Sequence, residues 1–170
     1  MENVQQFAIR ILSKHVLMSD DAVMFDIDDT LINSNCGKPI KWVVDIFHLC
    51  KKLGYITIII TARPDSDENK RYTKNELSKC GIEADLLLFA LPENKTTTKN
   101  QLKNRIIMSF GDQITDLDGG LYFVKLPDYM NKKYYIGTNI SSDSGNLCKS
   151  QTSSSAHQHS SFASGSKSSS

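Results

Sequence analysis

The sequence predicts a doubly wound α/β domain built on a mainly parallel sheet. Short apolar runs of strand length alternate with stretches of helical periodicity, which is the pattern of right-handed crossovers covering both faces of such a sheet. Polar breaks rich in Asp, Thr and Arg follow several of these runs. At 170 residues the chain can bury one sizeable core, so a single domain is expected.

The first half of the chain contains two helices and two strands in alternation. Apolar positions at near-helical spacing predict a helix over 3–16, and the run AVMFDI predicts a strand over 22–27. A helix is expected to begin at Pro39 and to stop at Gly54. The β-branched run YITIIIT, 55–61, is apolar on both alternating faces, which predicts a strand covered on both sides.

The second half repeats this alternation with shorter elements. Helices are expected over 68–80, with Gly81 as the C-terminal cap, and over 96–103. The remaining strands are expected at 85–90, 105–110 and 121–126. Beyond about residue 140 the composition is dominated by Ser, which cannot bury enough apolar surface to offset its ordering entropy. The domain is therefore predicted over 1–140 and a disordered Ser-rich tail over 141–170.

Composition excludes few classes of function. Lys and Arg total 20 against 19 for Asp and Glu, so no overall basic field favours nucleic acid as an obligatory partner. No apolar stretch is long enough to cross a bilayer and no signal peptide is visible, so a cytoplasmic protein without a membrane partner is expected. The four cysteines lack the spacing of a zinc site or a disulfide framework.

Acidic and hydroxyl side chains follow the ends of three predicted strands. Asp26 and Asp28 follow the first strand, Thr61 ends the second, and Asp112 and Asp116 follow the fourth. With a strand order 3-2-1-4-5, the first and fourth strands are neighbours, and ligands bind at the switch point between them. Clustered carboxylates require a cation, and oxygen-only ligands favour Mg²⁺ over Zn²⁺. Asp29 and Thr30 are interpreted as residues that secure the turn.

The sequence contains, in order, DIDDT, a strand ending in Thr61, a following lysine and GDQITD. These four features resemble the four motifs of the haloacid dehalogenase (HAD) superfamily of aspartate-nucleophile phosphotransferases. Two longer stretches are similar to the acid phosphatase subfamily IIIB of this superfamily. The first is TARPDSDENKRYTKNELSKCG, and the second is GDQITDL together with the later VKLPDYMNKKYYI. The resemblance spans about residues 22–137 and implies a HAD-like Rossmannoid core. The spacing between the motifs leaves no room for a cap domain, so the core is expected to be capless.

The resemblance also implies roles for individual residues. Asp26 would be the nucleophile that forms an aspartyl-phosphate. Asp28 would be the general acid that protonates the leaving oxygen and the general base that deprotonates the hydrolytic water. Thr61 would donate its hydroxyl to the phosphoryl group. Mg²⁺ would be held by Asp26, Asp112, Asp116 and the backbone carbonyl of Asp28.

Two assignments stay open at the level of sequence. A lysine should neutralise charge between Asp26 and the phosphoryl oxygens, and Lys95 is preferred because it begins a helix facing the strand ends; Lys99 is next. Arg63 could bind the substrate phosphate or could pair with Asp65 or Asp67.

The function expected from this resemblance is that of a Mg²⁺-dependent phosphomonoesterase acting on small phosphate esters such as nucleotides. Two alternatives remain. A nucleic-acid 3′-phosphate or a phosphoprotein could be the substrate of the same chemistry, because a capless site is open. A non-catalytic storage or binding protein could also use this fold.

Overall fold

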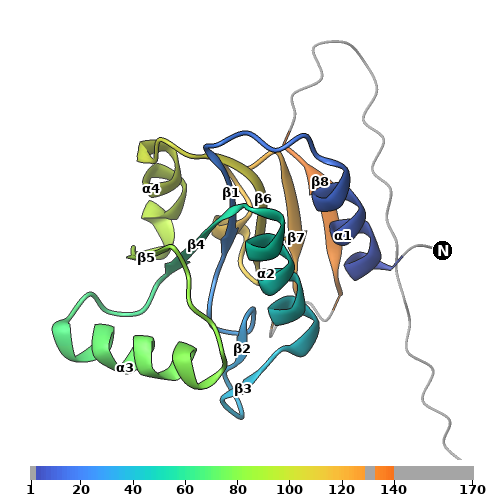
Figure 1. Cartoon of the computed structure of the whole chain (residues 1–170). Coiled ribbons are helices and arrows are strands. Elements are labelled where there is room, and N and C mark those ends of the chain that lie inside the picture. Colours follow the sequence, from blue (N-terminus) through green and yellow to red (C-terminus); the bar gives the residue numbers. More distant parts are fainter. Residues whose placement is uncertain (1–2, 129–132, 140–170) are drawn as a thin grey trace, which may run out of the picture.

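The computed structural model describes residues 3–128 and 133–139, which form a six-stranded sheet with helices on both faces (Figure 1). The predicted tail over 141–170 lies outside the described residues. No helix in the described part of the chain is long and apolar enough to cross a membrane. The helices are α1 (Val4–Lys14), α2 (Lys41–Leu53), α3 (Asp67–Lys79) and α4 (Lys95–Gln101), with 3₁₀ turns η1 (Pro92–Asn94) and η2 (Ile114–Asp116).

The strands of the main sheet lie in the order β5-β4-β1-β6-β7-β8. They are β1 (Asp21–Phe25), β4 (Ile56–Thr61), β5 (Leu86–Phe89), β6 (Arg105–Gly111), β7 (Tyr122–Lys125) and β8 (Tyr135–Thr138). All pairs are parallel except β7 with β8. The five strands expected from the sequence therefore adopt the order 3-2-1-4-5, which confirms a mostly parallel, Rossmann-like α/β sheet.

Side-chain alternation along the strands sends apolar groups to both faces. Phe25 of β1 points to the face covered by α1 and α2, where its ring stacks on Phe110 at 4.8 Å and meets Phe47 edge-on at 5.3 Å between centroids. Its neighbour Met24 points to the opposite face, where Leu102, just after α4, packs. β4 is buried on both faces from Ile58 to Thr61, as its uninterrupted apolar run predicts.

The predicted helix stops at Gly54 and Gly81 are confirmed, since both residues take the left-handed conformation, with φ of +94° and +71°. The predicted helix start at Pro39 is wrong. Pro39 belongs to a small hairpin formed by β2 (Ile32–Asn33) and β3 (Lys38–Pro39), and α2 begins two residues later at Lys41. Strand β8 was not expected; it pairs antiparallel on the free edge of β7.

The register of β1 and β6 brings their carboxyl ends together. Phe25 is paired with Phe110, and the Asp26 amide donates a 3.0 Å hydrogen bond to the Phe110 carbonyl. Residues that follow these two strands must consequently lie side by side at the switch point. In the described ranges, the connections at this edge carry only the β2–β3 hairpin and the two 3₁₀ turns, and no further domain.

Candidate metal centre and phosphoryl site

Three carboxylates converge where β1 and β6 end. Asp26 directly follows β1, Asp112 directly follows β6, and Asp116 ends the 3₁₀ turn η2. One oxygen from each lies within 4.8 Å of the others, and the residues are 5%, 7% and 0% exposed. Buried carboxylates at this spacing form a group that can bind a metal ion.

A buried lysine bridges two of these carboxylates. The Lys95 Nζ atom donates to Asp26 Oδ1 at 2.8 Å and to Asp116 Oδ1 at 2.5 Å. Lys99, one turn further along α4, donates instead to the backbone carbonyls of Asp116, at 2.7 Å, and Asp118. Of the two candidate lysines, Lys95 is thus placed on the carboxylates and Lys99 on the loop that carries them.

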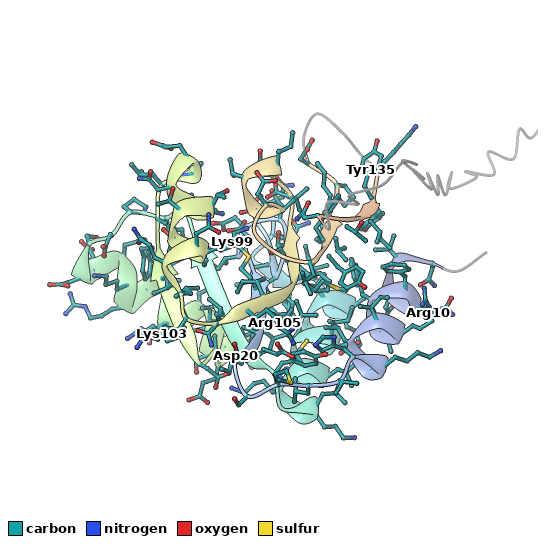
Figure 2. All side chains as sticks on the ribbon, turned by 90° about the horizontal axis from the view of Figure 1, so that it is seen from above. Arg10, Asp20, Lys99, Lys103, Arg105 and Tyr135 are labelled. Carbon is teal, nitrogen blue, oxygen red and sulfur yellow. The ribbon has the colours of Figure 1, made fainter. Side chains whose placement is uncertain are left out.

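Lys103 is the third lysine of the segment KTTTKNQLK, after Lys95 and Lys99, and it lies away from the site. Lys103 comes two residues before Arg105, the first residue of β6, whose amide donates to the Asp20 carbonyl at 3.0 Å, and Figure 2 shows the Lys103 label on the side of Asp20 and Arg105 and apart from Lys99. Lys103 is therefore at the amino ends of the strands, whereas Asp26 is at their carboxyl ends, on the other side of the sheet along the strand direction.

The pKa directions show that this group carries excess negative charge. The pKa of Asp26 is raised from 3.8 to about 7, mainly by burial and also by the charge of Asp116, while Lys95 opposes the rise. Burial also raises the pKa of Asp112. For Lys95, burial by itself would lower the pKa, but Asp26 and Asp116 outweigh it and raise the pKa. When all three carboxylates are ionised, the Lys95 ammonium that contacts them neutralises one of the three negative charges and leaves two.

The loop between β6 and η2 is held against the sheet by close packing and a buried cation. A Cβ atom at Gly111 would stand 2.1 Å from the Asp116 Cβ, so only glycine lets the Asp116 side chain fold back over β6. Lys125 is 8% exposed and donates to the Asp112 carbonyl at 3.0 Å. The same Nζ atom reaches Leu126 O and Asp128 Oδ2, which anchors the loop to the end of β7.

Asp28 and Arg63 form a bidentate ion pair at the rim of the site. Arg63 Nε donates to Asp28 Oδ2 at 2.9 Å, and Nη2 donates to Oδ1 at 2.6 Å. Arg63 pairs on its other side with Glu76, and it does not take the partners Asp65 or Asp67 that the sequence offered. Its binding of a substrate phosphate stays a prediction.

Asp28 lies two residues after Asp26, in the turn that follows β1, and its carboxylate does not belong to the group formed by Asp26, Asp112 and Asp116. Asp29 has a φ of +54°, and its carboxylate accepts hydrogen bonds from the Ser34 amide at 2.9 Å and hydroxyl at 2.7 Å, as expected of a turn residue. The Thr30 hydroxyl was expected to bond the backbone, which is wrong: Oγ1 is buried without a partner among the described residues. The Thr30 amide secures the turn instead, through Ile27 O at 3.2 Å.

Thr61 ends β4 in a fully buried position, and its hydroxyl accepts a 3.3 Å hydrogen bond from the Arg63 amide.

Two residues of the site, Lys125 and Glu76, were not predicted from the sequence. Lys125 carried a signal, because it is a charge inside the apolar strand LYFVKL. Glu76 carried none, because nothing in a polar helix marks which carboxylate turns toward a distant arginine.

Comparisons with known proteins add little to this geometry. No protein-family model matches the chain, and no curated protein matches its sequence. A solved structure titled "Structure of Pnkp1/Rnl/Hen1 complex" is similar in backbone with a TM-score of 0.49 and 20% sequence identity. The alignment covers 56% of this chain and 40% of that chain, so this chain spans less than half of its neighbour's length. We draw no conclusion about function from this similarity.

Proposed function

We propose that this chain is a Mg²⁺-dependent phosphomonoesterase of the HAD type, which hydrolyses small phosphate esters such as nucleotides through an aspartyl-phosphate. The observation that carries this proposal is the environment of Asp26. Its carboxylate is buried at the end of β1, shared with a lysine and faced by two further carboxylates. A structural ion pair needs one acid for each base, whereas this group contains three acids for one base.

Mg²⁺ suits the donor set of this group. Asp26, Asp112 and Asp116 offer carboxylate oxygens and no nitrogen or sulfur, which favours a hard cation over zinc. A divalent ion would also balance the two negative charges that Lys95 leaves. When bound, Mg²⁺ supplies charge neutralisation that lets an anionic phosphate approach an anionic nucleophile.

Each side chain then has its own role in the reaction. An Asp26 oxygen forms a bond to phosphorus while the ester P–O bond breaks, and Asp28 passes a proton to the leaving oxygen. Water next attacks phosphorus and gives a proton to Asp28, and the bond from phosphorus to Asp26 breaks to release phosphate. Lys95 and the Thr61 hydroxyl stabilise the phosphoryl oxygens, so that catalysis is mostly positioning and electrostatics.

The proposal is tested by hydrolysis of an aryl phosphate with Mg²⁺ or with a chelator. We expect Mg²⁺-dependent turnover for the native chain and a loss of at least about 10³-fold for Asp26→Asn, because an amide cannot form the covalent intermediate. Asp45→Asn, at an exposed carboxylate that pairs with Lys41, is the matched control and should retain native turnover. Equal rates for the native chain and Asp26→Asn would reject the mechanism and favour a non-catalytic role.

The choice of small esters is tested by competition in the same assay. A nucleoside monophosphate, a 3′-phosphorylated oligonucleotide and a phosphopeptide are compared as alternative substrates. We expect the nucleotide to have the highest kcat/KM, because the neutral overall charge of the chain provides no field that would favour a polyanion.

A further inference from the structure

Arg63 connects helix α3 to the loop that carries Asp28. On one side its Nε and Nη2 atoms hold both oxygens of Asp28, at 2.9 and 2.6 Å. On the other side its Nη1 atom donates to Glu76 Oε2 at 2.6 Å and to Thr73 Oγ1 at 3.3 Å. One guanidinium thus joins the loop that carries Asp28 to helix α3, which follows Arg63 in the sequence.

Asp28 is the most exposed residue in this chain of contacts. The Thr73 residue is fully buried, and Glu76 and Arg63 have side chains 20% and 13% exposed. The Asp28 side chain is 46% exposed. Thr73 and Glu76 are three residues apart on α3 and therefore share one helix face. The anchored end of the network is the helix, and the accessible end is the carboxylate that must meet substrate.

This arrangement fixes Asp28 more firmly than Arg63 alone could. Both partners of an isolated Asp–Arg pair keep rotamer freedom, and an arginine side chain keeps more of it than most residues. A second carboxylate and a hydroxyl on a rigid helix remove the freedom of the guanidinium. Its planar fork then sets the plane of the Asp28 carboxylate, whose remaining lone pairs stay open to the solvent side.

We propose that Glu76 is a positioning residue: by holding Arg63, it orients the Asp28 carboxylate beside Asp26 for proton transfer. The orientation of Arg63 by Glu76 stands on the hydrogen bonds alone. The consequence for proton transfer rests on the proposed function, since that function assigns the proton to Asp28.

The kinetic test compares variants of Glu76 with a matched glutamate of the same helix. We expect Glu76→Ala to lower kcat about 10- to 100-fold with KM changed less than about threefold, because misplacement of an acid–base group affects the chemical step. Glu76→Gln keeps a hydrogen-bond acceptor and should retain most of the turnover, and Glu76→Asp, one methylene shorter, should behave like Glu76→Ala. Glu68→Gln, at an exposed position of α3, should match the native chain.

A double-mutant cycle separates positioning from an independent role. If Glu76 acts through Arg63, the double variant Arg63→Ala with Glu76→Ala is no slower than Arg63→Ala alone. Multiplying losses in the double variant would overturn the inference, as would native kcat in Glu76→Ala or a change confined to KM.

A second measurement needs no turnover. The ¹⁵N heteronuclear NOE of the Arg63 Nε–H group reports the order of the guanidinium on the picosecond to nanosecond timescale. We expect a rigid value in the native chain and Glu76→Gln, and a mobile one in Glu76→Asp and Glu76→Ala. An unchanged NOE in Glu76→Asp overturns the inference. A native chain that is inactive but shows the expected NOE pattern would refute the phosphatase proposal while leaving the orientation of Arg63 by Glu76 established.

Discussion

Addition of Mg²⁺ should stabilise the folded chain strongly, because the buried carboxylate group is short of positive charge. Asp26 has a pKa of about 7 in the fold against 3.8 for an ordinary aspartate. A carboxyl whose pKa is raised in the fold destabilises the fold when it is ionised, so the charged Asp26 costs stability at about pH 8, and this penalty is absent below about pH 4. A cation that neutralises the group can recover much of this free energy.

The size of the expected shift follows from binding linkage. A ligand at 100 times its Kd stabilises the fold by about 2.7 kcal/mol, and an unfolding entropy near 2.1 cal/mol/K per residue converts this into a Tm increase of about 10 °C for the described domain. Thermal unfolding followed by circular dichroism at about pH 8, with chelator or with Mg²⁺ up to about 20 mM, measures it.

Variants make this measurement specific to the site. Asp112→Asn removes one ligand and one of the repelling charges, so it should raise or preserve the metal-free Tm and respond to Mg²⁺ by less than about 2 °C. Asp45→Asn, an exposed control, should keep the full response. A native Tm that Mg²⁺ leaves unchanged would refute the assignment of a metal centre, and so would a full response in Asp112→Asn.

Further predictions concern the fold around the site. Gly111→Ala places a methyl group on the Asp116 side chain, so it should lower the free energy of unfolding by at least about 2 kcal/mol and abolish the Mg²⁺ response. Asp21 is buried, but hydrogen bonds including those from Arg105 outweigh burial and lower its pKa to about 2. Its stabilisation, about 2 kcal/mol at pH 7, should be lost as pH falls from about 4 to 2, and Asp21→Asn should remove this acid dependence. Ser109→Ala should cost less than about 0.5 kcal/mol, because the buried hydroxyl has no partner among the described residues.

Urea unfolding measures the free energy of unfolding of Gly111→Ala, Asp21→Asn and Ser109→Ala. For Asp21→Asn the measurement is repeated over a range of pH. An exposed neighbour, Asp20, supplies the matched Asp20→Asn control, which should keep the native acid dependence. A Gly111→Ala variant of native stability would show that the Asp116 side chain can move aside. A large loss in Ser109→Ala would show that its hydroxyl has a partner after all, such as an ordered water.

Local sequence patterns sufficed for much of the sheet. The β-branched run that became β4 and the glycines that end α2 and α3 act through short-range sterics and burial, so they can be recognised without knowledge of the fold. Alternation of helices and strands predicted a doubly wound sheet, and the order 3-2-1-4-5, which places Asp26 beside Asp112, is the one that the structure adopts. Strand β8 could not be anticipated in this way, because its formation depends on a free edge of β7 that exists only in the assembled sheet.

By itself, the sequence determined on which edge of the sheet Asp26 and Asp112 lie, because a residue directly after a buried parallel strand lies at the carboxyl end of that strand. Only the tertiary structure decided which charges meet. It placed Lys95 on the carboxylates and Lys99 on the carbonyls, and it gave Arg63 to Asp28 and Glu76 in place of its sequence neighbours. The physical reason is that a long cationic side chain reaches acceptors several ångströms away, and its choice among them depends on packing between elements that are remote in the sequence.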